Sequence, residues 1–313
     1  MGDGEPAERR RCRLCAEGRP CVYPEIDYLG GQTVAKLFGI IGDPVENSLS
    51  PAIHRLFFDQ CGIDAEYRRF PAKKEELRER LRELRERNIS GFNVTHPHKQ
   101  AVIEFLDEID LPAKEAGAVN TVVCKGERWI GTNTDGTGFI ASLKEHVADI
   151  GEISTLIIGA GGAARAIYRA LLEEGAKRID VANRHPDRAA WMVERLNGGR
   201  AESRVMTLED CERRLSGYGL VVQTTPVGMA PLDGRTPVSL RHLSDKALVI
   251  DIIYHPKETV FLREARRKGA KTANGLPMLL HQAAFAFQKW FGHLPDIAPV
   301  REKIDQILEE RSC

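Results

Sequence analysis

Hydrophobic residues in the first third of this chain form short runs separated by amphipathic segments. Three of these runs predict strands, at residues 34–42, 65–71 and 91–95. Apolar residues recur at helical spacing over 52–62, where Ser50 and Pro51 form a helix-start signature in which the serine hydroxyl accepts from a backbone amide. A charged helix is expected over 73–88. Its apolar face consists of Leu77, Leu81 and Leu84.

The middle of the chain changes from this alternation to a hairpin. Residues 101–110 predict a helix, and residues 119–125 and 128–135 predict two strands that form a hairpin. Another helix is expected to start at residue 136.

The second half returns to apolar runs separated by helical segments. The runs predict strands at residues 154–159, 178–184, 220–225 and 247–254. This alternation indicates parallel strands joined by crossover helices, and hence an α/β fold. A long apolar helix over 276–292 is expected to be followed by a short charged tail.

Composition narrows the kind of partner. The 313 residues suffice for two domains, and Lys plus Arg balance Asp plus Glu at 45 each. This balance gives no support for nucleic acid or a membrane surface as partner, and favours a small molecule. The chain has no apolar stretch long enough to span a bilayer and no apolar run at its start. We therefore expect a cytoplasmic protein.

Seven cysteines do not indicate a secreted disulfide framework, because the number is odd and the chain is long. Cys12, Cys15 and Cys21 cluster in an N-terminal extension, residues 1–30, that we expect to be flexible. These thiols could hold zinc with a fourth ligand from elsewhere. No such ligand is nearby, and we expect no metal.

A glycine loop is the strongest motif that the residues carry by themselves. Gly159, Gly161 and Ala164 have G-x-G-x-x-A spacing, after an apolar strand and before an amphipathic helix. Glycines there allow backbone amides to approach a pyrophosphate at the helix N-terminus, whose dipole favours negative charge. The motif predicts a dinucleotide site that includes Ala160, Gly162 and Ala163.

The next strand indicates which dinucleotide binds. An NAD site usually has an acidic residue about 20 residues beyond the glycines. Here the strand ends in Asn183 and Arg184, with Arg188 one helical turn further on. Guanidinium groups match phosphate oxygens, so this end favours the 2′-phosphate of NADP.

Taken together, the motifs identify a known family. GDPVENSLSP, GFNVTHPHK, AGAVNT, GTNTDGTGF, GAGGAARA, TTPVGM, DIIYHP and NGLPMLLHQA follow one another in family order. From about residue 34 to 292 the chain resembles shikimate dehydrogenases, enzymes of aromatic amino acid and chorismate biosynthesis. They interconvert 3-dehydroshikimate and shikimate with NADP.

The resemblance implies an α/β substrate-binding domain and an inserted Rossmann-type NADP-binding domain, with a cleft between them. The substrate domain would comprise residues 31–135 and 275–313, and the NADP domain residues 136–274. A homodimer is compatible with this organisation, although the sequence does not determine the oligomeric state.

The resemblance also implies residue roles. The substrate residues would be Ser48, Ser50, Thr95, Asn120, Tyr254 and Gln282. Thr224, Met229 and Gly275 would join the cofactor site. His185 departs from the family, which often has threonine at that position.

Oxidation of a secondary alcohol requires a proton acceptor, and reduction of the ketone requires a proton donor. The family pair for this chemistry corresponds to Lys99 and Asp135. We assign Lys99 as the general acid/base and Asp135 as its orienting partner. His96 and His98 flank Pro97, and we expect neither to be catalytic or to bind metal.

Two alternatives belong to different classes. A quinate/shikimate dehydrogenase would also oxidise quinate and would often prefer NAD; Arg184 and the NGLPMLLHQ segment are evidence against it. A non-catalytic dinucleotide-binding regulatory module would be expected to lack Lys99 or Asp135, and both are present.

Overall fold

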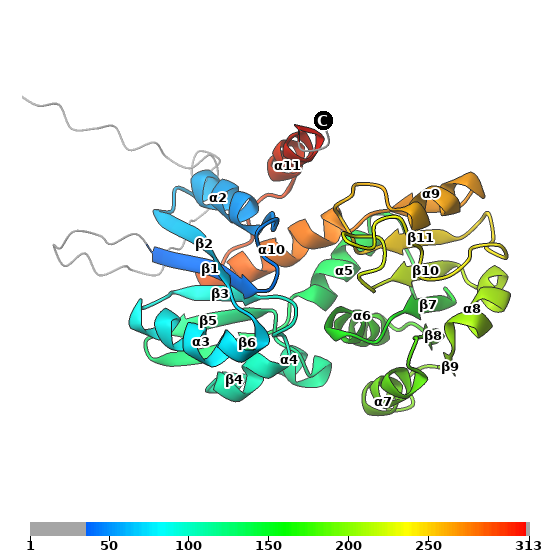
Figure 1. The fold of residues 1–313 in the computed structure, drawn as a ribbon, viewed down its shortest axis with the longest axis horizontal. Coiled ribbons are helices and arrows are strands. Elements are labelled where there is room, and N and C mark those ends of the chain that lie inside the picture. The colour runs from blue at the N-terminus through cyan, green and yellow to red at the C-terminus, as the bar shows by residue number, and fades with distance from the viewer. Residues whose placement is uncertain (1–35, 311–313) are drawn as a thin grey trace, which may run out of the picture.

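The computed structural model describes residues 36–310, and within this range the strands form two six-stranded sheets. Figure 1 shows the sheets on opposite sides of the molecule, with helices α5 and α10 between them. The N-terminal extension and its three cysteines lie outside the described residues. Within 36–310, no helix is both long enough and apolar enough to cross a bilayer.

The first sheet is mixed and has the order β2-β1-β3-β5-β6-β4. Its strands are β1 (Lys36–Gly42), β2 (Ala65–Pro71), β3 (Gly91–Val94), β4 (Glu108–Ile109), β5 (Thr121–Lys125) and β6 (Arg128–Thr132). The antiparallel β5–β6 pair confirms the predicted hairpin. Helices on this side are α2 (Ser50–Cys61), α3 (Leu77–Glu86), α4 (Leu111–Ala116), α10 (Leu276–Phe291) and α11 (Ala298–Glu310).

The second sheet is parallel throughout and has the order β12-β11-β10-β7-β8-β9, as the alternating pattern predicts. Its strands are β7 (Thr155–Ile158), β8 (Ile179–Ala182), β9 (Val205–Met206), β10 (Leu220–Gln223), β11 (Leu248–Asp251) and β12 (Lys271–Ala273). The associated helices are α5 (Asp135–Leu143), α6 (Gly162–Glu173), α7 (Pro186–Asn197), α8 (Leu208–Arg214) and α9 (Val260–Arg267).

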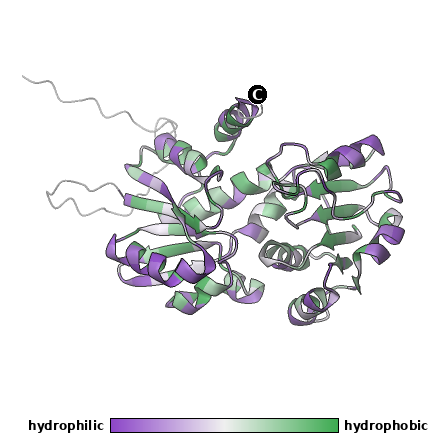
Figure 2. Cartoon of the chain, in the orientation of Figure 1, coloured by the Kyte–Doolittle hydropathy of each residue, from purple (hydrophilic) through white to green (hydrophobic). Residues whose placement is uncertain are grey.

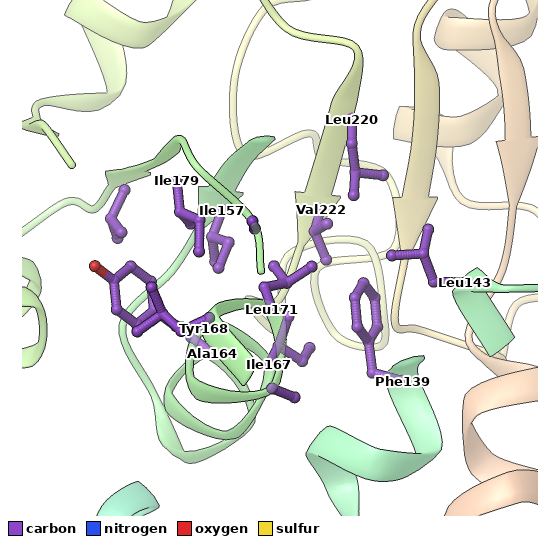
Figure 3. Close-up of a cluster of buried hydrophobic side chains, with 14 of the residues drawn as sticks. Phe139, Leu143, Ile157, Ala164, Ile167, Tyr168, Leu171, Ile179, Leu220 and Val222 are labelled. Atoms are coloured by element: carbon purple, nitrogen blue, oxygen red, sulfur yellow. The ribbon is translucent and has the colours of Figure 1, made fainter. Parts of the chain in front are cut away.

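Burial follows the hydrophobic pattern. In Figure 2 the strands of the second sheet are largely hydrophobic, whereas α3 is largely hydrophilic, with Leu77, Leu81 and Leu84 buried as expected. Figure 3 shows Phe139 and Leu143 of α5 packed with α6 and the strands of the second sheet. Burial of one such side chain stabilises the fold by roughly 1.5–3 kcal/mol.

Residues 101–110 do not form the predicted helix. They form a short 3-10 helix, η2 (Ala101–Phe105), followed by strand β4, which pairs with β6. The backbone amide of Asp107 donates to Trp129 O at 3.0 Å, and its carboxylate accepts from the Trp129 amide at 2.7 Å. These hydrogen bonds to the hairpin replace the ones that a helix would make.

The charged tail expected after residue 292 contains a helix that the sequence analysis did not specify. This helix is α11, which buries Val300, Ile304 and Leu308. These residues recur every four positions and pack in the core under α2 and α10. The remaining surface of α11 is charged, which concealed its apolar stripe.

Candidate active site

Loops that follow the carboxyl ends of strands in both sheets carry most of the candidate residues. Strand β1 leads to Ser48, β3 to Thr95 and Lys99, and β7 to the glycine loop. Ligands of α/β proteins bind characteristically at the carboxyl ends of parallel strands. The fold therefore gives a physical reason for these positions.

Lys99 is placed by the turn after β3. The amide of His98 donates to Thr95 O at 2.9 Å, and Lys99 O accepts from the amide of Val119 at 2.7 Å. These bonds fix the backbone, and Lys99 Nζ donates to Asp135 Oδ2 at 2.6 Å. The Lys99 side chain is 21% exposed and that of Asp135 only 7%. The pair is therefore close and shielded, with the lysine as its accessible member.

Asp135, Asn120 and Gln282 converge on one point. Asp135 is the first residue of α5, Asn120 precedes β5, and Gln282 lies in α10. The Asn120 amide donates to Asp135 Oδ1 at 2.7 Å and lies 3.3 Å from Gln282 Oε1. Helices α5 and α10 approach closely there, because a β-carbon on Gly138 would lie 2.7 Å from Gln282 N. The structure thus joins four predicted residues, including Lys99, in one cluster.

The two serines lie at the start of α2, but the expected cap is wrong. Leu49 is the N-cap residue, and Ser48 Oγ accepts from the amide of Ser50 at 3.2 Å. Ser50 is already the first residue of α2, so it does not occupy the N-cap position. The Ser48 hydroxyl, not that of Ser50, therefore accepts from a backbone amide at this end of the helix. Ser50 is buried and Ser48 is half-buried.

Two other substrate candidates come from different parts of the fold. Thr95 is half-buried and packs its methyl group near Gly42. Tyr254 is half-buried against the core of the first sheet.

Two histidines, His96 and His98, lie close to Lys99 in the chain. His98 is buried, with Nε2 2.7 Å from Ala72 O. His96 is exposed; its partial burial lowers its pKa below the usual value, and the nearby Lys74 lowers it further. Within residues 36–310 there is no group of His, Cys, Asp and Glu side chains arranged to hold a metal ion.

The glycine loop has the geometry that its sequence predicts. Gly159 has a φ of +119°, and a β-carbon there would lie 2.3 Å from Thr224 Oγ1. Thr224 in turn donates to Ile158 O at 2.7 Å, so the predicted Thr224 lies beside the loop. Across the loop, a β-carbon on Gly162 would be 3.6 Å from Lys99 Cδ. The dinucleotide motif is therefore adjacent to the lysine.

Cationic side chains gather near the end of β8. Arg184 and Arg188 are exposed, and Asn183 Nδ2 donates to His185 O at 2.8 Å. Burial lowers the pKa of Arg165, and the positive charge of Arg188 lowers it further. At least two of the arginines are therefore close enough to repel each other, which an anion between them would relieve.

Arg165 and Trp191 were not anticipated from the sequence. The Arg165 guanidinium lies over the Trp191 ring, 4.2 Å from its centroid, although Trp191 is 42% exposed. An arginine in the first turn after the glycines and a tryptophan on the next helix were the available signals. Their contact depends on how α6 and α7 pack.

The remaining cofactor candidates lie in separate loops. Met229 is 39% exposed in the loop after β10. Gly275 is the N-cap residue of α10 and donates to Ile253 O at 2.9 Å. Neither makes a described contact with the glycine loop.

The residues present fit a phosphorylated dinucleotide. No side chain caps the N-terminus of α6, and a β-carbon on Gly161 would meet no atom within 4 Å. The amides at this end are thus accessible to an anion. Among the described residues, the buried Arg165 Nε has no hydrogen-bond acceptor. A phosphate or ribose oxygen would satisfy it.

The fold and the site define the class: a two-domain α/β protein with a Rossmann-type sheet whose glycine loop faces a lysine–carboxylate pair. Three family models match consecutive parts of the chain. They are the shikimate dehydrogenase substrate binding domain at residues 40–122, shikimate / quinate 5-dehydrogenase at 142–256, and the shikimate 5′-dehydrogenase C-terminal domain at 275–304.

Individual proteins similar to this chain point to the same family. A shikimate dehydrogenase (NADP(+)) of Bacillus licheniformis is 43% identical over 88% of this chain and 99% of its own length. A solved structure of shikimate 5-dehydrogenase from Thermus thermophilus, in complex with NADP(H) and shikimate, is 37% identical with a TM-score of 0.77, covering 85% of this chain and 97% of that one. The chain belongs to the shikimate dehydrogenase family.

The family also includes enzymes with another substrate. Quinate dehydrogenase from Corynebacterium glutamicum, solved in complex with NAD, is 32% identical with a TM-score of 0.79, covering 87% of this chain and 99% of that one. Fold similarity alone therefore does not separate the two activities.

Proposed function

We propose that this protein is an NADP-dependent shikimate dehydrogenase that reversibly reduces 3-dehydroshikimate to shikimate in chorismate biosynthesis. The observation that carries the proposal is the Lys99–Asp135 pair, 2.6 Å apart and adjacent to the glycine loop. A proton-transfer group beside a dinucleotide motif is the arrangement that alcohol oxidation requires. Identity of 43% to an NADP-dependent relative supports the same conclusion.

Lys99 acts as the general acid/base. NADP held at the glycine loop would supply the hydride acceptor for the alcohol carbon and, as NADPH, the hydride donor for the ketone carbon. Lys99 Nζ takes the hydroxyl proton during oxidation and gives a proton to the ketone oxygen during reduction. Asp135 Oδ2 accepts from Nζ and so orients it, while Asn120 Nδ2 donates to Asp135 Oδ1 and also to Gln282 Oε1.

Substrate binding uses both ends of the site. Asn120, Asp135 and Gln282 bind the ring hydroxyls, together with Thr95. Ser48 and Ser50, at the start of α2, bind the carboxylate with their hydroxyls, where the helix dipole also favours negative charge. Tyr254 completes the set. The family resemblance supports these assignments, and the convergence of Asn120 with Gln282 adds geometric support.

Cofactor binding uses the N-terminus of α6 and the cationic end of β8. Gly159, Ala160, Gly161, Gly162 and Ala163 form the pyrophosphate loop, beside Thr224. Asn183, Arg184 and Arg188 bind the 2′-phosphate, and Arg165 contributes positive charge near Arg188. Met229 and Gly275 border the nicotinamide end.

The direct test measures the absorbance of reduced nicotinamide in four mixtures, shikimate or quinate with NADP or NAD. We expect turnover largely confined to shikimate with NADP. Strong quinate oxidation with NAD would transfer the protein to the quinate branch. No turnover in any mixture, together with a cofactor fluorescence change, would favour the regulatory alternative.

We also propose the domain division at residues 135/136 and 274/275. Helix α5 supplies Phe139 to the core of the second sheet, whereas α10 supplies Phe287 to the core of the first. Limited proteolysis that cut first inside the second sheet would contradict this division. Cytoplasmic location and a homodimer stay predictions, and light scattering would determine the oligomeric state.

A further inference from the structure

A buried arginine outside the proposed site connects a helix of the first sheet to a helix of the second. Arg169, on α6, donates from Nε to the carboxylate of Glu115 on α4, and from Nη2 to that of Glu173, one turn further along α6. The Arg169 side chain is only 10% exposed, whereas those of Glu115 and Glu173 are 34% and 45% exposed. One carboxylate partner therefore lies across the boundary between the two sheets, and the other lies on the same helix as the arginine.

Burial makes the partner on α4 important for the arrangement of the helices. Taking a guanidinium group out of water is costly, and a buried charge that loses a partner destabilises the arrangement that buries it. Glu173 would stay beside Arg169 wherever α4 moved, because both are on α6, but Glu115 would not. The Glu115–Arg169 ion pair thus favours the arrangement in which α4 lies against α6.

Helices α4 and α6 approach closely beside this ion pair. Ala116 of α4, Ala118 in the loop after α4 and Ala166 of α6 form a buried cluster. At the start of α5, a β-carbon on Gly136 would lie 2.6 Å from Ala166 O, and at the start of α6 a β-carbon on Gly162 would lie 3.8 Å from Ala118 Cβ. Short side chains cannot follow a helix that moves away, so a shift of α4 would open gaps in this packing.

The loop after α4 supports both members of the proposed acid/base pair. The amide of Val119 donates to Lys99 O at 2.7 Å. Asn133 Nδ2 donates to Ala118 O at 2.8 Å, and Asn133 Oδ1 accepts from the amide of Asp135 at 3.0 Å. The position of α4 on α6 therefore sets where Lys99 and Asp135 lie relative to the glycine loop.

We infer that Glu115 and Arg169 are positioning residues whose ion pair holds α4 against α6 and thereby sets the distance between the Lys99–Asp135 pair and the cofactor loop. The inference rests on the proposed dehydrogenase function. Hydride transfer requires the nicotinamide and the acid/base pair to meet at the same carbon and its oxygen. The rate of this step should therefore depend on the ion pair more strongly than cofactor binding does.

The test compares Glu115→Ala with Glu173→Ala. Each variant removes one carboxylate partner of Arg169 from a partly exposed position, but only Glu115→Ala breaks the link between the two helices. We expect Glu115→Ala to lower the rate of hydride transfer in a single turnover by about tenfold, since a misplacement of about 1 Å can cost about 100-fold. Its NADP affinity in fluorescence titration should match the wild type, because the glycine loop and the arginines after β8 both belong to the second sheet. Glu173→Ala should keep the wild-type rate and affinity.

A double-mutant cycle tests whether the two residues act as one pair. Arg169→Met removes the guanidinium group and keeps most of the aliphatic stem. The Glu115→Ala/Arg169→Met double variant should lose little more of the hydride-transfer rate than Arg169→Met alone. Multiplying losses, equal losses in Glu115→Ala and Glu173→Ala, or a wild-type rate in Glu115→Ala would overturn the inference. A wild-type protein without turnover would instead reject the proposed function on which the inference rests.

Discussion

The Cδ atom of Lys99 lies 3.6 Å from the position that a β-carbon on Gly162 would take. The proposed acid/base group therefore borders the first residue of the dinucleotide-binding helix. This contact joins a loop of the first sheet to a loop of the second.

Replacing Lys99 should affect chemistry rather than cofactor binding. Lys99→Met keeps an aliphatic stem beside Gly162 and removes only the amine. We expect kcat to fall by about 100-fold or more, since a positioned acid/base contributes 10²–10⁴-fold. Fluorescence titration should give a nearly unchanged NADP affinity. The control is Lys144→Met, which removes an exposed ion pair with Glu174. A loss confined to NADP affinity would refute the role of Lys99.

Cofactor preference should depend on the end of β8. Arg184→Ser with Arg188→Ser removes two positive charges at the proposed 2′-phosphate site. We expect kcat/KM for NADP to fall by roughly tenfold to 100-fold, since a hydrogen bond to a charged group contributes about 1.5–3 kcal/mol. The value for NAD should change little. Arg213→Ser, at an exposed position of helix α8, is the control. An unchanged NADP to NAD ratio would contradict the assignment.

Acid stability should depend on His54. Burial lowers the pKa of His54 from 6.5 to about 3, so the folded state keeps this imidazole neutral. The neutral imidazole contributes its full share to the free energy of unfolding above pH 6.5. As the pH falls, the unfolded chain binds a proton at His54 before the folded chain does, so stability is lost. The loss is about 2 kcal/mol between pH 7.5 and 5.

Replacement of His54 by phenylalanine should remove this dependence and keep an aromatic ring against Tyr67, on which His54 stacks with ring centroids 4.4 Å apart. Urea unfolding at both pH values would measure it. The control is His146→Gln, at an exposed position, which should keep the wild-type dependence. Equal pH dependence in His54→Phe and the wild type would reject the prediction.

The buried carboxyl of Asp251 should have the opposite effect to His54 and make the fold less stable as the pH rises. Burial raises the pKa of this carboxyl from 3.8 to about 6, although Thr259 and the amide of Ile253 both donate to it. The folded state therefore binds the proton more tightly than the unfolded chain, and stability falls as the pH rises from about 3.8 to 6. The penalty above pH 6 is on the order of 2–3 kcal/mol.

Asp251→Asn should therefore be less destabilised than the wild type when the pH rises from 4 to 7. Thermal unfolding across this range would show it. Asp245→Asn, at an exposed position, should follow the wild type. An Asp251→Asn variant that loses as much stability as the wild type over this interval would contradict the prediction.

The pattern of apolar residues was sufficient to predict a helix or strand where one side of that element is buried uniformly. Leu77, Leu81 and Leu84 predicted a helix face, and the apolar run before Gly159 predicted a parallel strand. These features depend on neighbours in the chain. Residues 101–110 failed, because hydrogen bonds from the hairpin at Trp129 outweighed helical spacing.

The sequence by itself determined most of the longer strands, the glycine loop and, through family motifs, the candidate residues. Only the tertiary structure decided which of them meet. Asn120 and Gln282 are separated by 162 positions, and their contact depends on helix α10 returning beside α5. The stacking of Arg165 on Trp191 likewise depends on packing between two separate helices. A hydrogen bond is directional and short, so its partners become known only when the backbone positions are fixed.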